Sequence, residues 1–242
     1  MRIFAISDLH ICLSQNKPMD IFGTHWENHW QKISNDWCER VSDDDVVIIS
    51  GDISWALTYQ NATLDLDAIS KLPGRKILVK GNHDLWWQTI TKMRNAYSPN
   101  MEFIQNNAVK INNYIFAGSR GWPSKEIDGT FPPSHCVNSK NQDNVKIHAR
   151  EILRLNNSLI HAKKLAQEGD KIIGLIHYPP FNSRFMDSGF TELFEKNGVC
   201  VVIYGHLHGD KPRTFMIYEK SGIKYYLTSC DLLNFKMIEI KI

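Results

Sequence analysis

Five short clusters of Asp, Asn and His residues are spread along the chain, each directly after a short apolar segment. Imidazole and carboxylate groups together suit zinc, manganese, iron or nickel, whereas calcium prefers a shell of oxygens alone. The clusters therefore indicate a site for transition-metal ions. They read Asp8-Leu9-His10, Gly51-Asp52, Gly81-Asn82-His83-Asp84, His177-Tyr178-Pro179-Pro180 and Gly205-His206-Leu207-His208.

The number of candidate donors exceeds what one tetrahedral ion can use, and it fits two ions that share one carboxylate. Within the first and last clusters the donors are two residues apart, so in an extended segment they point the same way. Two ions about 3.5–4 Å apart can clamp a phosphoryl group in an in-line displacement and lower the pKa of a bound water to about 7. The candidate donors are Asp8, His10, Asp52, Asn82, His177, His206 and His208.

Alternating strand-like and helix-like segments would bring these clusters together. Each cluster follows a short apolar run that predicts a buried strand. The carboxyl ends of neighbouring parallel strands meet at one edge of a sheet, where ligand sites of α/β proteins collect. We therefore expect all the clusters on one rim. The predicted strands are 2–7, 46–50, 76–80, 172–176 and 199–204.

Helical spacing of apolar residues predicts the segments that flank these strands. A long helix carries Ile152 to Ala166 on one face and ends near Gly169, and residues 215–242 are expected to form three antiparallel strands. Segment 119–143 shows no helical or strand periodicity and is predicted to be a long loop, and such loops are usually functional or mobile. We expect one α/β domain over residues 1–242, with helices flanking a β core. The other predicted helices are 24–41, 54–72 and 85–97, and the other predicted strands are 103–104, 109–111 and 114–117.

The bulk properties exclude several classes of protein. The 242 residues are 43% apolar and 22% charged, the balance of a soluble globular protein. Lys and Arg number 28 against 26 Asp and Glu, a net charge of +2 that offers no bulk attraction to nucleic acid or membranes. No run reaches the roughly 18–20 apolar residues of a membrane span, and Ile3 to Ile6 is too short for a signal-peptide core. The five cysteines lack a paired spacing, which predicts reduced thiols and a cytoplasmic location.

The ordered set D-x-H, G-D, G-N-H-D, H and G-H-x-H resembles the signature of the calcineurin-like metallophosphoesterases, and it spans residues 8–208. The resemblance implies a four-layer αββα sandwich, with two mixed central β-sheets flanked by helices. It also implies a metal-dependent phosphohydrolase that cleaves a phosphate mono- or diester by attack of a metal-bridging hydroxide, without a covalent enzyme intermediate. Two divalent metal ions would be the cofactors, with manganese expected and iron, zinc or nickel as alternatives.

The resemblance also implies a role for each motif residue. His83 would not bind metal; it would protonate the leaving alkoxide or stabilise developing charge. Asp84 would help to fix the loop that carries His83. Asp52 would bridge the two ions. The first ion would be held by Asp8, His10, Asp52 and His208, and the second by Asp52, Asn82, His177 and His206.

One motif departs from the protein Ser/Thr phosphatases of this family, which carry G-D-x-x-D-R. Here Gly51-Asp52 is followed by Ile53-Ser54-Trp55-Ala56, so the second Asp and the Arg are missing. The pattern looks more like the small bacterial-type phosphoesterases and phosphodiesterases, with a small phosphate ester as substrate. It does not choose between monoesters and diesters, and it does not define the oligomeric state.

Several readings stay open at the level of sequence. Arg120 and Arg184 follow strands and could pair with phosphate oxygens as a fork, or be solvated loop residues. A catalytically inactive scaffold of the same fold and a nuclease are alternative functions. The chain keeps every motif residue, which disfavours the scaffold, and its charge offers no phosphate-tracking patch for a nuclease. Four tryptophans could pack beneath metal loops or form a wall against a base or aromatic leaving group: Trp55, Trp86, Trp87 and Trp122.

Overall fold

Two β-sheets form the centre of the molecule. The computed structural model describes residues 1–15, 17, 19–97, 99–123, 139–181, 184–209 and 215–242. The sheets pack face to face through one apolar cluster, to which Ile48 and Ile77 contribute from one sheet and Phe116, Leu175 and Ile203 from the other. This cluster is the middle of the core, and it fixes the two sheets relative to each other.

The first sheet has five strands, four of them parallel. They are β1 (Ile3–Ile6), β2 (Val46–Ser50), β3 (Arg75–Val79), β4 (Met101–Ile104) and β11 (Ile238–Glu239). Their order in the sheet is β11-β1-β2-β3-β4, and β11 runs antiparallel to β1. Every residue of β1 and β2 is buried, as expected for parallel strands that are covered on both faces.

The second sheet has six strands and is also mixed. They are β5 (Ala108–Ile111), β6 (Tyr114–Ser119), β7 (Lys171–Ile176), β8 (Val199–Tyr204), β9 (Ile217–Lys220) and β10 (Ile223–Leu227). Their order is β5-β6-β7-β8-β10-β9; β6, β7, β8 and β10 run parallel, and the edge strands β5 and β9 are antiparallel to their neighbours.

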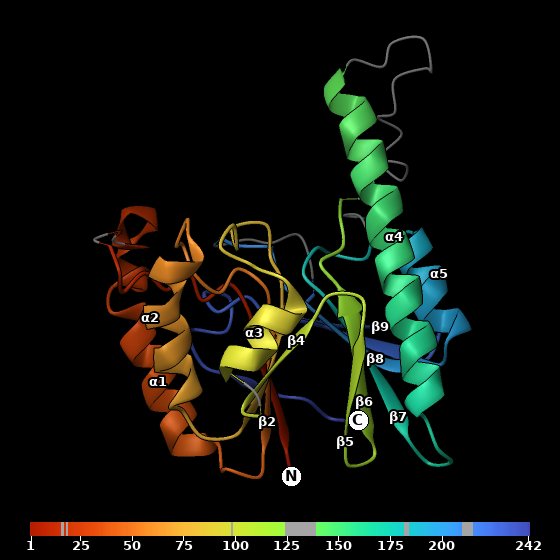
Figure 1. The fold of residues 1–242 in the computed structure, drawn as a ribbon, viewed down its shortest axis with the longest axis horizontal. Helices are drawn as coiled ribbons and strands as arrows, with labels where there is room; N and C mark the ends of the chain where they lie inside the picture. Colours follow the sequence, from red (N-terminus) through yellow and green to blue (C-terminus); the bar gives the residue numbers. More distant parts are fainter. Residues whose placement is uncertain (16, 18, 98, 124–138, 182–183, 210–214) are drawn as a thin grey trace.

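Helices cover the outer face of each sheet (Figure 1). On the first sheet, α1 (His29–Arg40), α2 (Tyr59–Ser70) and α3 (Ile90–Tyr97) bury residues such as Trp37 and Leu66. On the second sheet, α4 (Ser139–Leu165) and α5 (Gly189–Lys196) bury Leu155, Leu159 and Phe194 among others. The layers are therefore helix, sheet, sheet and helix, which confirms the expected αββα sandwich.

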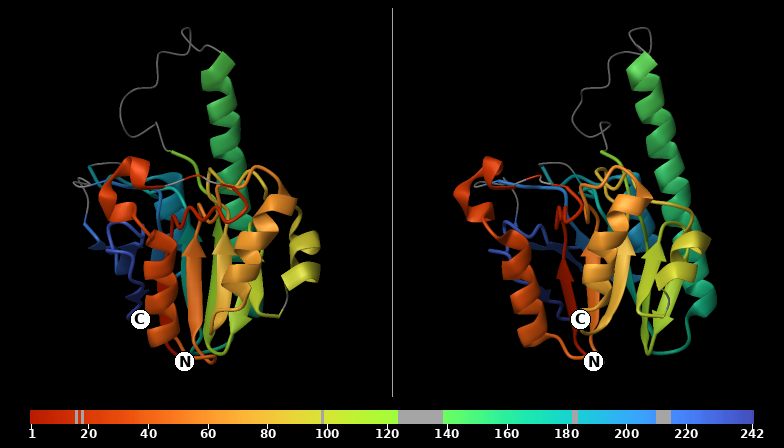
Figure 2. Two further views of the ribbon diagram at one scale, coloured as in Figure 1. Left: turned by 90° about the vertical axis from the view of Figure 1, so that its left-hand side faces the viewer. Right: turned by 60° about the vertical axis from the view of Figure 1, so that its left-hand side comes forward.

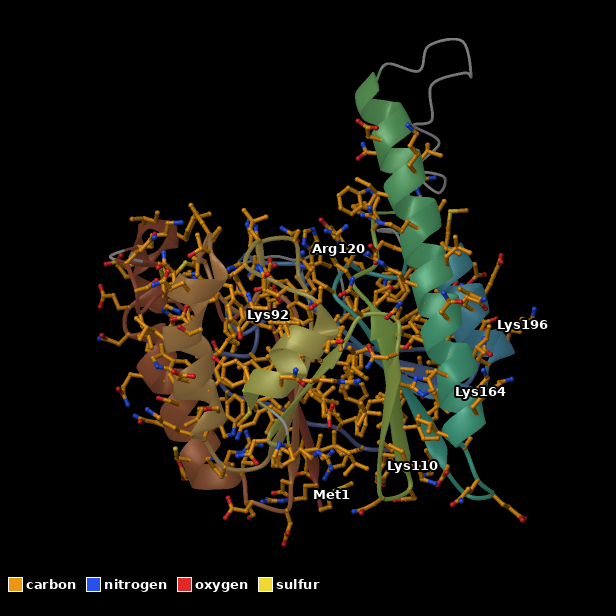
Figure 3. All side chains as sticks on the ribbon, in the orientation of Figure 1. Met1, Lys92, Lys110, Arg120, Lys164 and Lys196 are labelled. Atoms are coloured by element: carbon orange, nitrogen blue, oxygen red, sulfur yellow. The ribbon has the colours of Figure 1, made fainter. Side chains whose placement is uncertain are left out.

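The parallel strands of both sheets end at a common edge, which lies uppermost in both views of Figure 2. The amino-terminal part of α4 projects beyond this edge, whereas the two termini lie at the opposite end. Figure 3 shows side chains filling the space between the layers, with Arg120 near the upper edge. No helix in the described ranges is both long and apolar enough to cross a bilayer.

Two helices are shorter than the apolar spacing predicted. In the stretch 24–41, a 3₁₀ turn at Thr24–Trp26 is separated from α1 by Asn28, whose left-handed φ of 54° interrupts the helix. In the stretch 54–72, α2 begins only after Thr58, whose hydroxyl caps the first turn. Local backbone geometry at these residues therefore overrides the apolar period.

Two other helices also differ from expectation. α3 begins later than the predicted stretch 85–97. α5 was not predicted; it begins at a capping box formed by Ser188 and Thr191 and has eight residues, which is too short for a clear period. α4 begins at Ser139, within the predicted loop 119–143; residues 124–138 of that loop lie outside the described residues.

The carboxyl-terminal segment contains three strands, as predicted, but they do not form one antiparallel unit. β9 and β10 are antiparallel, β10 is parallel to β8, and β11 joins the first sheet. The chain crosses between the sheets after Ser229, which forms an isolated bridge with Ser7. Strand pairing of this kind depends on distant partners, so a weak local alternation does not define it. Of the five cysteines, the four that the structure describes are free thiols: Cys12, Cys38, Cys200 and Cys230.

Candidate metal centre

The loops that follow β1 and β8 bring together a first group of donors, here called the first cluster: Asp8, His10 and His208. Their ligand atoms lie within 4.8 Å of one another. Nε2 of His208 is 3.2 Å from Oδ1 of Asp8 and 3.4 Å from Nε2 of His10. Asp8 and His10 are buried and His208 is partly open to solvent, so the cluster has one accessible side.

The loops that follow β2, β7 and β8 form the second cluster: Asp52, His177 and His206, whose ligand atoms also lie within 4.8 Å of one another. Nε2 of His177 is 3.4 Å from Oδ2 of Asp52. Asn82, after β3, adds an amide oxygen that is 2.8 Å from Nε2 of His177 and 2.9 Å from Nδ1 of His206. All seven donors predicted from the sequence therefore lie in two adjoining clusters.

Asp52 faces both clusters. Its Oδ2 lies 4.0 Å from Nε2 of His10 and 3.4 Å from Nε2 of His177. Its Oδ1 accepts a hydrogen bond of 2.8 Å from the backbone N–H of His83. The geometry is compatible with a shared carboxylate whose orientation is fixed by the neighbouring loop.

Four of the donors have a left-handed backbone. Asp8, His10, Asp52 and His206 have φ values of 60°, 47°, 51° and 73°. Each such residue costs about 1–3 kcal/mol and is retained only where its surroundings impose it. Backbone hydrogen bonds from Asp8 to the carbonyl of Gly51 (2.9 Å) and from His10 to that of Asp52 (3.0 Å) do so here. Strain concentrated in these turns is typical of a functional site.

The glycines of the motifs allow the loops to approach closely. A Cβ at Gly81 would lie 2.0 Å from Oδ1 of Asp52. A Cβ at Gly205 would lie 2.3 Å from the hydroxyl of Ser7 and 2.4 Å from Oδ2 of Asp8. No side chain fits at either position, so glycine is required there by contact with a donor carboxylate.

The carboxylates of the clusters attract positive charge. Burial alone would raise the pKa of Asp8, but the hydrogen bond with His208 and the charges of His177 and His208 outweigh burial and hold this pKa well below its usual range. Burial likewise opposes the charged form of His177, but Asp52 and Asp8 raise its pKa to about 9. Burial, with smaller contributions from neighbouring histidines, lowers the pKa of His10 and of His206 to about 4.

This donor set fits a pair of transition-metal cations. It combines carboxylates, an amide oxygen and imidazoles, the ligands that such ions accept. Because protons held on histidine provide positive charge beside the carboxylates, cations can take the place of these protons on binding.

Asp84 joins the loops that follow β2 and β3. It is fully buried and accepts hydrogen bonds from the backbone N–H groups of Gly81 (2.7 Å), Ile53 (2.9 Å) and Ser54 (3.2 Å), and from the indole of Trp86 (3.1 Å). Burial and the charge of Asp52 raise the pKa of Asp84 to about 7. The residue therefore holds the loop of His83 against that of Asp52.

Sequence reasoning missed Asp231 and Ser229, which follow β10. Oδ1 of Asp231 is 2.9 Å from Nδ1 of His208, and its Oδ2 accepts from the N–H of Gly209 (3.0 Å). The hydroxyl of Ser229 donates to Oδ2 of Asp8 (2.9 Å). The signal was a polar run, Thr-Ser-Cys-Asp, at the end of a strand, the same pattern as in the five recognised clusters.

The two arginines that were predicted to contact a phosphate group differ in burial. The Arg120 side chain is mostly buried; its guanidinium lies 3.7 Å from Oε1 of Glu151 and 4.7 Å from the ring centre of Trp122. The carbonyl of Arg120 accepts from the N–H of His177 (3.1 Å), so its backbone adjoins the second cluster. Arg184 is exposed. A phosphate-binding role for either remains a prediction.

Comparison with known proteins agrees with this geometry. Among curated proteins no significant match is found. The fold resembles TT1561 of Thermus thermophilus (TM-score 0.56, 13% identity, 99% of this chain and 98% of that one). It also resembles the phosphopantetheinyl hydrolase PptH of Mycobacterium tuberculosis (TM-score 0.53, 13% identity, 99% and 95%). A family model described as calcineurin-like phosphoesterase matches residues 1–210. The chain belongs to the calcineurin-like phosphoesterase family.

Proposed function

We propose that this protein is a phosphohydrolase that cleaves a phosphate mono- or diester at a pair of divalent metal ions. The proposal depends on one observation: two Asp and His clusters meet at Asp52, and His83 adjoins the same carboxylate. Asp8, His10 and His208 would hold one ion, Asn82, His177 and His206 the other, and Asp52 would contact both. Manganese is the expected metal. When bound, the ions would supply a nucleophilic solvent molecule at neutral pH and positive charge for the phosphate oxygens.

In this proposal His83 would act on the substrate rather than on a metal. Its side chain is 43% exposed, and its Nε2 lies 3.9 Å from Oδ2 of Asp52. Its backbone N–H is tied to Oδ1 of the same carboxylate, and its ring packs 4.4 Å from that of Trp55. The imidazole is therefore held at the open side of the clusters, where it can donate a proton to the leaving oxygen of an ester.

Other residues would orient the donors. Asp231 accepts from Nδ1 of His208 and so directs Nε2 of that ring toward Asp8, 3.2 Å away. Beside the second cluster, the ring of Tyr178 lies 4.3 Å from that of His206 and 5.5 Å from that of Trp122. Arg120 packs on Trp122 and would contribute positive charge on this side of a bound phosphate.

Exchange of His83 for alanine tests the catalytic part of the proposal. With added Mn²⁺, wild-type protein should hydrolyse p-nitrophenyl phosphate or its bis ester. His83→Ala should keep its metal but lower kcat for an alkyl ester about 10²- to 10⁴-fold. The loss should be smaller for p-nitrophenyl esters, because an acidic leaving group needs no proton. Failure of the wild type with Mn²⁺, Fe²⁺ and Zn²⁺ on every generic ester would overturn the proposal.

Exchange of Asp52 for asparagine tests the shared carboxylate. Asp52→Asn should lower the content of both ions, measured by emission spectrometry after dialysis. Asp44→Asn, at an exposed position between α1 and β2, is the matched control and should retain the wild-type content. Equal metal content in the two variants would contradict the role of Asp52.

A further inference from the structure

A cavity of about 510 Å³ lies beside the first cluster. Three of its walls are the imidazoles of His10, His83 and His208, so it opens on the side where His83 would meet a substrate. Its volume is within the range of about 300–1,000 Å³ that is usual for pockets of small organic ligands. The other described lining residues are Met19, Phe22, His25, Trp26, Trp55, Gly209 and Asp231.

Two tryptophans give this cavity rigid aromatic walls. Trp55 stacks on His10, with ring centres 4.7 Å apart and planes at 23°, and its indole N–H points to the sulfur of Met19 (3.0 Å). Trp26 is only 4% exposed and packs edge-on against Phe235, with ring centres 5.2 Å apart. Neither indole can turn away without loss of these contacts, so the apolar walls are formed before any ligand binds.

A role in holding the candidate metal ligands does not explain all the aromatic residues that line the cavity. Trp55 does hold the ring of His10. Within the described part of the chain, no recorded contact joins Phe22 to a candidate donor. Phe22 lines the cavity from the 3₁₀ turn Met19–Phe22, and 60% of its surface is exposed. A large aromatic side chain that is exposed to solvent at the edge of an aromatic pocket is stabilised only when an apolar group covers it.

We propose that this cavity binds the organic group of the substrate, and that the preferred substrates are phosphate esters of aromatic or similarly bulky apolar alcohols. This inference rests on the proposed function. With phosphorus between the clusters, the ester oxygen would face His83 and the organic group would pack against Trp55 and Trp26. Hydrolysis breaks the bond between phosphorus and the ester oxygen, and phosphorus gains the oxygen of water. One proton of that water leaves with the alcohol and the other stays with the phosphate product.

The test compares 2-naphthyl phosphate with phenyl phosphate, whose leaving phenols have similar acidity, on the Mn²⁺-loaded protein. The larger ring should raise kcat/KM about 10-fold or more, the gain expected from additional apolar contact in a preformed pocket. Phe22→Ser should reduce this ratio at least about threefold by the same reasoning. Ile21→Ser is the matched control: Ile21 is the neighbouring residue, is 72% exposed and is not among the described lining residues, so the ratio should not change.

A second measurement does not depend on catalysis. In metal-free protein, saturation-transfer NMR should detect binding of 2-naphthol, and Phe22→Ser, but not Ile21→Ser, should weaken it. Hydrolysis of both esters at equal kcat/KM, without naphthol binding, would overturn this inference and leave the proposed function intact. Naphthol binding that depends on Phe22, in a protein that hydrolyses no ester, would support the cavity assignment while overturning the proposed function.

Discussion

Gly81 is the position where a single methyl group should affect both of the proposed metal sites. Its added Cβ would lie 2.0 Å from Oδ1 and 2.2 Å from the backbone nitrogen of Asp52. Ordinary van der Waals contact begins at 3.4 Å, so the carboxylate oxygen must move by about 1.4 Å, or the loop of Gly81 must move instead. Gly81 does not have a positive φ, so the effect of alanine is steric and not a matter of backbone strain.

A displacement of this size is too large for a metal site. Ligand distances in such sites hold to within about 0.2 Å. Because Asp52 faces both clusters, Gly81→Ala should lose both ions, and kcat/KM for p-nitrophenyl phosphate should fall at least about 10²-fold, the usual cost of a 1 Å misplacement.

Two other glycines separate this effect from a general loss of stability. Gly169→Ala meets nothing within 4 Å but has φ +85°, so it should cost about 1–2 kcal/mol of unfolding free energy and leave the metal content unchanged. Gly205→Ala would press on Asp8 and should deplete the first site more than the second. Metal content is measured by emission spectrometry and folding by circular dichroism. A folded Gly81→Ala protein with wild-type metal content and kcat/KM would refute the reasoning.

Three further predictions concern the donors and one distant carboxylate. Asp231→Asn should weaken Mn²⁺ binding at the first cluster about 10- to 100-fold in a metal titration, since His208 loses the carboxylate that orients it; an unchanged affinity would argue against this role. Because the pKa values of His177 and His208 are raised to about 9 and about 10, metal binding must displace their protons, so affinity should rise with pH between 6 and 8. Calorimetry in two buffers should detect about two protons released per chain, and none would contradict the assignment. Burial opposes ionisation of Asp45, but hydrogen bonds from Arg2 outweigh burial and lower the pKa of this carboxyl group. The ionised Asp45 therefore stabilises the fold above the pKa that it has in the unfolded chain. This stabilisation is lost as the pH falls through the pKa of the folded state. Urea unfolding of Asp45→Asn should therefore show about 1–3 kcal/mol less stability at pH 7 and a smaller deficit at pH 3.

The rim of the site was predictable because the sequence patterns that define it are local. In β2, four β-branched residues are followed by Ser50 and then by Gly51-Asp52. A short apolar run before a polar cluster occurs again before Asn82 and before His206. Parallel pairing of such strands then places the clusters on one edge without any knowledge of the loops.

Features that depend on distant partners were not predictable. Asp231 contacts His208 because β10 lies beside β8, a pairing that nothing in the local alternation of the carboxyl-terminal segment defines. Asn28, whose left-handed backbone separates the 3₁₀ turn Thr24–Trp26 from α1, is likewise not predictable from apolar spacing.

The contact between the two sheets also determines which nitrogen of His177 would be available to a metal. Nδ1 of this buried ring is 2.9 Å from the carbonyl of Ser50, at the end of β2 in the opposite sheet, so its N–H donates there. Nε2 is thereby left to face Asp52 and Asn82. A Cβ at Gly51 would lie 2.4 Å from Nδ1, which explains the glycine before Asp52. Because Ser50 also donates its hydroxyl to a carbonyl of β8, packing of the sheets and orientation of this donor are one structural feature, and a substitution that separates the sheets should impair the second cluster before it unfolds the protein.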